Sequence, residues 1–177
     1  MGATAVSLNP ALEDVHFCPR CGKPPTIDAP RSITCTHCGY GAFYNPKPVA
    51  VVIPITAGND VILMRRGFEP RRGHWSLPGG FVDLGETVET AAAREVREEL
   101  DLRVEITGLV GVYSRAEDRT VVVVYAAAAK GIPSTSEEAL EVRAFAPIDI
   151  PWQELAFWTE QRALQDYLGS ESRLAHS

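Results

Sequence analysis

The chain has 177 residues, of which 45% are hydrophobic and 23% are charged, values that are ordinary for a globular protein with a hydrophobic core. This length accommodates one mid-sized domain and a small appendage. The formal net charge of -6 excludes a broad basic surface, so nonspecific binding to nucleic acid is not expected. An acidic protein can still bind an anionic substrate when divalent cations bridge the two.

Membrane and export signals are not found in the sequence. No window approaches 18 continuous apolar residues, and the first fifteen, MGATAVSLNPALEDV, lack the basic start and apolar run of a signal peptide. A myristoylation signal would need Ser or Thr at position 6, which is Val. We therefore expect a cytoplasmic protein with no membrane partner.

All four cysteines lie near the N-terminus, as the pairs CPRC and CTHC separated by 13 residues. Two CxxC pairs supply the four thiolates of a tetrahedral zinc site, and a glycine follows each pair, as in zinc knuckles. Two disulfides in a secreted domain, or a redox CxxC, are the less favoured alternatives. The pattern predicts a structural Zn²⁺ bound by Cys18, Cys21, Cys35 and Cys38, with His37 as a bystander.

The role of this zinc ribbon is open between two interpretations. A segment this short cannot bury a core and would use zinc to fold, which is the preferred reading. Its basic residues Arg20, Lys23 and Arg31 leave contact with nucleic acid as the alternative. The expected organisation is a flexible N-terminus at 1–15, the ribbon at 16–44, a main domain at 45–170 and a flexible tail at 171–177, with the Pro-rich YNPKPV at the junction.

The main domain is expected to alternate strands and helices. Runs rich in β-branched residues predict strands at 49–56 and 61–66, joined as a hairpin by AGND. A short strand is expected in the Gly/Pro-rich loop 73–86, followed by a helix of about 13 residues. The remaining elements are strands at 102–114, 120–129 and 141–148 and a helix at 151–168. This order indicates an α/β fold, with a mixed sheet between helices.

The first of these helices carries an unusual density of glutamate. Thr87 is a good N-cap, and Val88, Ala92, Val96 and Leu100 form a buried row. Glu95, Glu98 and Glu99 are expected to converge on one edge, where like charges cost a few tenths of a kcal/mol per pair. Arg94 and Arg97 are expected to point largely away from Glu95 and Glu99, which leaves the repulsion incompletely relieved.

Two interpretations of this cluster follow from helical spacing alone. One is a solvated charged face, and the other is a site for Mg²⁺ or Mn²⁺, which are hard cations that prefer carboxylate and phosphate oxygens. The preceding LPGG favours the metal site, because two glycines let the backbone approach a ligand closely. Glu86, at the junction of loop and helix, can turn toward the same cluster.

Residues 80–102 resemble the Nudix box, which reads Gly, five residues, Glu, seven residues, and Arg-Glu-aliphatic-x-Glu-Glu-x-Gly-aliphatic. The matching residues are Gly80, Glu86, Arg94, Glu95, Val96, Glu98, Glu99 and Leu102. One position departs, since Asp101 replaces the box glycine, and Asp tolerates the left-handed conformation at modest cost. The flanking WSLPGGF strengthens the resemblance.

The resemblance implies a fold and a set of site residues. Residues 49–168 look like a whole Nudix domain, an α/β/α sandwich with a mixed sheet behind a small zinc ribbon. Glu95, Glu98 and Glu99 would bind Mg²⁺, with Glu86 and the backbone carbonyl of Gly79 assisting. Arg94 would hold Glu86 or its neighbours by a salt bridge. The catalytic set is then Glu86, Arg94, Glu98 and Glu99.

The implied reaction is metal-assisted attack of water on one phosphorus of a diphosphate, with a nucleoside monophosphate as one product. Glu98 or Glu99 could be the general base, and so could Glu138 or Glu141, although these last two are more simply read as plain surface or hairpin charges. Tyr113, Trp152 and Phe157 could stack on a base, whereas core packing is the commoner role of such aromatics, and the expected role of Trp75.

The substrate is the least determined part of the resemblance. Ribbon-containing Nudix proteins hydrolyse ADP-ribose, FAD or NADH, but the SQPWPFP-type segment of NADH-directed relatives is absent, and Asp118 stands where ADP-ribose hydrolases often carry proline. A sanitising hydrolase of oxidised nucleoside triphosphates and a nucleic-acid-binding regulator with a nucleotide-sensing Nudix domain are the alternatives. The expected partner is a small-molecule nucleotide, with nucleic acid disfavoured. A homodimer is expected by analogy only.

Overall fold

The computed structural model describes residues 9–174, so parts of the two expected flexible ends, residues 1–8 and 175–177, lie outside the described residues. The chain divides into two compact units. The smaller consists of Met1–Pro46 with Arg115–Arg119, and the larger of Lys47–Ser114 with Thr120–Ser177. Among the described residues, no helix combines the length and apolar character needed to cross a membrane.

The smaller unit is built around a three-stranded antiparallel sheet in the order β1-β2-β3. Its elements are the 3-10 helix η1 (Pro10–Leu12) and the strands β1 (Thr26–Asp28), β2 (Ser32–Thr34) and β3 (Gly41–Phe43). Three-residue strands bury little apolar surface, and Ile33 is the strand residue buried most fully. This small core is consistent with a unit that depends on a metal for its stability.

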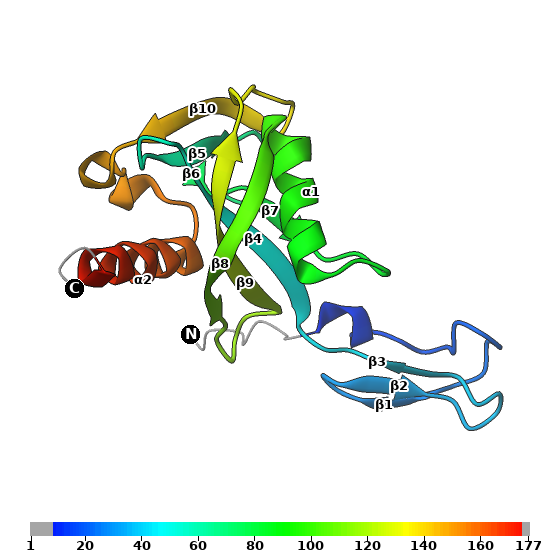
Figure 1. Ribbon diagram of the computed structural model, residues 1–177. Coiled ribbons are helices and arrows are strands. Elements are labelled where there is room, and N and C mark those ends of the chain that lie inside the picture. The colour runs from blue at the N-terminus through cyan, green and yellow to red at the C-terminus, as the bar shows by residue number, and fades with distance from the viewer. Residues whose placement is uncertain (1–8, 175–177) are drawn as a thin grey trace, which may run out of the picture. The chain divides into compact units, whose positions relative to one another are not determined.

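The larger unit contains one mixed seven-stranded sheet with a helix on each side (Figure 1). Its strands are β4 (Lys47–Ile55), β5 (Val61–Arg66), β6 (Trp75–Ser76), β7 (Gly79–Phe81), β8 (Arg103–Tyr113), β9 (Thr120–Lys130) and β10 (Ala139–Phe145). The main strand order is β10-β5-β4-β9-β8, with β6 beside β5 and β7 beside β4. Strands β4 and β9 run parallel, and the other pairs are antiparallel.

Strand β4 lies in the middle of the sheet and is buried on both faces. Val51 and Ile53 belong to one hydrophobic cluster, which includes residues of helix α2 (Trp158–Leu174). Ala50 and Val52 belong to a second cluster, which includes residues of helix α1 (Val88–Leu100). Because successive side chains of a strand point to opposite faces, the two helices cover opposite sides of the sheet. The expected α/β/α sandwich is confirmed.

Helix α1 begins and ends as the sequence predicts. The Thr87 hydroxyl accepts a hydrogen bond from the Thr90 N–H, so Thr87 is the N-cap. Asp101 terminates the helix in the left-handed region, with φ 50° and ψ 30°, as expected for the residue that replaces the box glycine. Its N–H donates to the Arg97 carbonyl, so the departure from glycine leaves the helix end intact.

Other boundaries differ from the sequence prediction. The predicted strand 141–148 lies at 139–145, and Pro147–Asp149 forms a 3-10 turn. The predicted helix 151–168 begins only at Trp158, after another 3-10 turn at Trp152–Glu154. Pro147 explains the earlier end of the strand, because a proline cannot donate to a strand ladder. The later start of the helix follows from Leu155 and Ala156, which pair with Trp75 and keep the backbone before Trp158 extended. The 73–86 loop contains two short strands, β6 and β7, where one was predicted.

Candidate active site and metal centre

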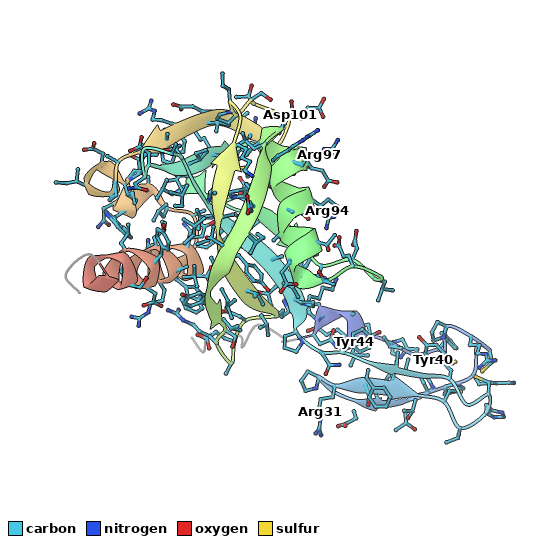
Figure 2. The ribbon with its side chains drawn as sticks, in the orientation of Figure 1. Arg31, Tyr40, Tyr44, Arg94, Arg97 and Asp101 are labelled. Atoms are coloured by element: carbon cyan, nitrogen blue, oxygen red, sulfur yellow. The ribbon has the colours of Figure 1, made fainter. Side chains whose placement is uncertain are left out.

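Three of the four box glutamates gather around one arginine. The Arg94 guanidinium donates to Glu86 at 2.8 Å, to Glu95 at 2.8 Å and to Glu98 at 3.0 Å (the residue is labelled in Figure 2). The salt bridge to Glu86 agrees with the role that the Nudix resemblance implies for Arg94. The expectation that Arg94 points away from Glu95 was wrong, because the long side chain bends back across the helix and reaches carboxylates at i+1 and i+4.

Glu99 has a different environment, since it turns inward. Only 3% of this residue is exposed, and its carboxylate accepts a hydrogen bond of 2.8 Å from the Gly79 N–H. Burial raises the pKa of Glu99 to about 8, the Gly79 N–H opposes the rise, and the charges of Glu95 and Glu138 add to it. Burial likewise raises the pKa of Glu95, against the effect of Arg94. Burial therefore disfavours the charged form of both carboxylates, and a bound cation would favour that form.

The two glycines of the LPGG segment are required by close packing. A Cβ on Gly79 would lie 2.5 Å from the Ala50 carbonyl oxygen, and a Cβ on Gly80 would overlap the Glu95 carboxylate. The Gly79 N–H binds Glu99, so the strand that carries this peptide runs directly beside the helix carboxylates. The backbone thus approaches the cluster as closely as the sequence predicts.

The oxygen-rich cluster suits a hard divalent cation by its chemistry. Its donors are carboxylates and a neighbouring backbone, and three of the carboxylates share a single guanidinium. Among the described residues only the four cysteines have ligand atoms all within 4.8 Å of one another, and three of the carboxylates are arranged around Arg94. Binding of Mg²⁺ would require Glu95 and Glu98 to exchange Arg94 for the cation.

The two candidate bases outside the helix lie in different places. Glu138 is exposed and near enough to Glu95 and Glu99 for its charge to raise the pKa of both. Glu141 accepts from the Arg65 guanidinium at 3.2 Å and from Arg143 at 2.9 Å, which is the pairing expected of a hairpin charge. The structure therefore brings Glu138 to the carboxylate cluster and engages Glu141 in ion pairs on strand β10.

The aromatic candidates are largely packed. Tyr113 is buried and its hydroxyl donates to Asp166 at 3.0 Å, so its ring is not presented to a base. Trp152 packs against the core cluster on the α2 side of the sheet. Phe157 contacts the Arg66 guanidinium, which lies 5.0 Å from its ring centroid. Trp75 is buried and packs edge-on against Phe145, as expected.

Sequence reasoning missed two buried charged residues near the site. Arg66 ends strand β5, contacts the rings of Phe68 and Phe157 with its guanidinium, and donates to the Pro70 carbonyl. Glu160, in the first turn of α2, binds the segment that leads into Gly79. Neither carries a local signal, since an Arg-Arg pair at a strand end and a glutamate in a first helical turn are common on protein surfaces.

The four cysteines form a compact sulfur cluster in the smaller unit. Cys18 and Cys38 have their Sγ atoms 3.7 Å apart, as do Cys21 and Cys35. A tetrahedron with Zn–S bonds of about 2.3 Å places its sulfurs about 3.8 Å apart, so the cluster matches a four-thiolate zinc site. Gly22 and Gly39 adopt positive φ and donate to the Cys18 and Cys35 carbonyls, giving two equivalent knuckles.

The comparisons with known proteins bear on the larger unit first. A family model described as NUDIX domain matches residues 46–167. The chain belongs to the Nudix hydrolase family. A solved structure of a NUDIX hydrolase from Nitrosomonas europaea is 34% identical, with a TM-score of 0.81, and the match covers 90% of this chain and 93% of that one. This likeness spans more of the chain than the Nudix domain alone.

Two curated relatives have more specific names. The chain is 32% identical over 103 residues to a NAD-capped RNA hydrolase NudC of Haemophilus influenzae, covering 56% of this chain and 39% of that protein. It is 44% identical over 75 residues to an ADP-ribose pyrophosphatase of Methanocaldococcus jannaschii, covering 42% of this chain and 44% of that protein. This Nudix chain thus spans less than half of the length of these relatives.

Gly80→Ala is expected to impair the site without unfolding the Nudix domain. The new Cβ meets the end of a flexible side chain, so Glu95 moves aside and the carboxylate cluster is disturbed. We expect Mg²⁺-dependent turnover to fall about 10- to 100-fold, as when groups that orient metal ligands are lost, with little change in melting temperature. The matched control is Gly108→Ala, because a Cβ on Gly108 meets no atom within 4 Å. Equal activity in the two variants would remove Gly80 from the site.

Metal analysis of the purified protein should find about one zinc per chain. Cys35→Ser should lose that zinc and the folded signature of the ribbon, because three thiolates and a hydroxyl bind zinc weakly. His37→Ala is the control, since His37 is exposed within the second knuckle while the four sulfurs already make a complete site. A reduced, folded protein without zinc would contradict the ribbon assignment.

Proposed function

We propose that this protein hydrolyses the diphosphate linkage of a nucleoside diphosphate derivative with Mg²⁺, most simply ADP-ribose, FAD or NADH, and releases a nucleoside monophosphate. The observation that carries the proposal is the carboxylate cluster beside the Gly79 backbone, in which three of the four box glutamates share one arginine and the fourth, Glu99, accepts from the Gly79 N–H. The names of the two curated relatives support an adenosine diphosphate moiety, which ADP-ribose and a NAD cap share.

The proposed metal ligands are Glu95, Glu98 and Glu99, assisted by Glu86 and the Gly79 carbonyl. A Mg²⁺ or Mn²⁺ ion held by these residues would supply charge neutralisation for the phosphates and would make water a better nucleophile at neutral pH. Glu98 is the box carboxylate most open to solvent, with 59% of its side chain exposed, so an incoming substrate can reach it. Arg94 would keep its ion pair with Glu86, and so stay beside the ligands, when Glu95 and Glu98 bind the cation.

Glu138 is the proposed general base. It is exposed, so water can reach it, and its charge acts on both Glu95 and Glu99. A carboxylate beside, but outside, the ligand set can accept a proton from attacking water while the ligands stay ionised. Glu98 and Glu99 remain the alternative, and Glu141 is disfavoured because Arg65 and Arg143 already bind it.

A hydrolysis screen tests the proposed reaction. It compares ADP-ribose, NADH, FAD, ADP-glucose, diadenosine polyphosphates, 8-oxo-dGTP and a NAD-capped RNA, with and without Mg²⁺, and resolves the products. AMP from a diphosphate-linked substrate supports the proposal. Preferred release of pyrophosphate from 8-oxo-dGTP would favour the sanitising alternative. A mobility shift with RNA or DNA at low salt, together with no hydrolysis, would favour the regulator.

Glu98→Gln and Glu99→Gln should each lower kcat by orders of magnitude, because an amide cannot replace a carboxylate as a charged ligand. Circular dichroism should show that both variants keep the fold. The control is Glu105→Gln, which removes a carboxylate from an exposed ion pair between Glu105 of β8 and Lys130 of β9. Wild-type turnover in both box variants would overturn the metal-ligand assignment.

Glu138→Gln and Glu141→Gln form a second matched pair. If Glu138 is the base, its variant loses about 10²- to 10⁴-fold in kcat and its pH–rate profile loses the acidic limb, whereas Glu141→Gln keeps both. The two residues lie three apart on one segment and both are ionisable, so the pair separates proton transfer from general surface charge. A larger loss in Glu141→Gln would reverse the assignment.

The oligomeric state is proposed to be a homodimer, by analogy with other Nudix hydrolases. Light scattering coupled to size-exclusion chromatography measures it directly. The ribbon is proposed to be structural, because its strands are too short to bury a core of their own.

A further inference from the structure

Glu160 is a carboxylate buried where polar groups are usually avoided. Only 4% of it is exposed, and it lies in the first turn of α2, away from the Nudix box in sequence. One oxygen accepts from the Ser76 hydroxyl at 2.5 Å and from the Leu77 N–H at 3.2 Å. The other oxygen accepts from the Phe157 N–H at 3.2 Å. The carboxylate therefore joins the start of α2 to strand β6.

A second set of contacts ties the same two segments together. The Ala156 N–H donates to the Trp75 carbonyl at 2.8 Å, and Leu155 forms a parallel bridge with Trp75. The residues just before α2 are thus added to the short strand β6 as a further piece of sheet. Glu160 continues this connection one residue beyond the end of β6, because its carboxylate accepts from the Leu77 N–H.

The chain continues from Leu77 directly into the carboxylate site. The Pro78 carbonyl accepts from the Val52 N–H at 3.0 Å, and the Gly79 N–H donates to Glu99 at 2.8 Å. Residues 76–79 are therefore held at each step, by α2 at one end and by β4 and α1 at the other. A shift of Ser76 or Leu77 would move the Gly79 peptide relative to Glu99.

We propose that Glu160 is a positioning residue for the catalytic cation, acting through Ser76 and Leu77 to fix the Gly79 peptide against Glu99. This inference rests on the proposed function, because it assumes that the Gly79 carbonyl and Glu99 are ligands. Helix α2, which lies on the opposite face of the sheet from helix α1 of the Nudix box, thereby helps to position the cation site. It also connects the ligand loop to Phe157, whose N–H Glu160 binds and whose ring contacts Arg66.

Docking of α2 alone does not explain a carboxylate at this position. Burial of an ionisable group disfavours its charged form, and here it raises the pKa of Glu160 to about 7, against the opposing effect of the Ser76 hydroxyl and two N–H groups. An apolar residue would pack the helix without this penalty, as Ala163 and Leu164 do one turn later. What the carboxylate adds is a fixed acceptor for three donors from two segments.

The test measures metal binding separately from catalysis. Ser76→Ala removes one hydroxyl, and Glu160→Gln keeps the shape but replaces one acceptor oxygen by a donor. The control is Asp166→Asn, which weakens another polar contact of α2, the bond to Tyr113 on the far part of the helix. Each variant is titrated with Mn²⁺ and followed by electron paramagnetic resonance, and its Mg²⁺ half-saturation for hydrolysis and its melting temperature are measured.

We expect Ser76→Ala and Glu160→Gln to weaken Mn²⁺ binding and to raise the Mg²⁺ half-saturation by about 10-fold or more, the usual cost of losing a group that orients a metal ligand. Asp166→Asn should lower the melting temperature and leave both metal constants unchanged. Unchanged metal constants in folded Ser76→Ala would overturn the proposal, even if Glu160→Gln fails to fold. A wild-type protein that binds Mn²⁺ but hydrolyses no diphosphate refutes the proposed function, whereas the Mn²⁺ titrations still decide the role of Glu160.

Discussion

The main constraint on the larger unit is that several carboxylates lie close together beside its central sheet. Helix α1 buries an apolar row against β4, and this packing carries Glu95 and Glu99 into a region with little water. Carboxylates placed this way repel one another and resist ionisation. Two groups stabilise the carboxylates: the Arg94 guanidinium pairs with Glu95, and the Gly79 backbone N–H donates to Glu99. A divalent cation would stabilise the charged carboxylates in place of these groups or together with them.

The backbone around Gly79 is held in place by the carboxylate cluster and in turn binds Glu99 of that cluster. Glycine is needed there because the neighbouring strand and a carboxylate leave no room for a Cβ. A peptide without side chains is also free to shift, so it has to be held by its neighbours. Val52 on β4, Glu99 on α1 and Glu160 on α2 hold successive residues of the segment. All three layers of the sandwich thereby contribute to one short loop.

The smaller unit meets a different constraint. Its three strands bury too little apolar surface to fold by hydrophobic packing alone, and its four sulfurs stand at the separations of a tetrahedral zinc site. Local geometry suffices for this, because each knuckle is closed by bonds within six residues. For that reason the ribbon was predictable from cysteine spacing, whereas its small β-sheet was not.

The sequence by itself determined the features that depend on local spacing: the cysteine knuckles, the cap at Thr87, the left-handed end at Asp101 and the placement of Glu95, Glu98 and Glu99 on one helix. It could not place long side chains, so the reach of Arg94 to three carboxylates was missed. Tertiary structure alone decided that Glu138 lies at the cluster while Glu141 pairs with Arg65, and that Glu160 contacts Ser76 across 84 residues of chain. The physical reason is that electrostatic and hydrogen-bond partners are set by distance in space, and these distances arise only when distant strands pair and the helices pack on the sheet.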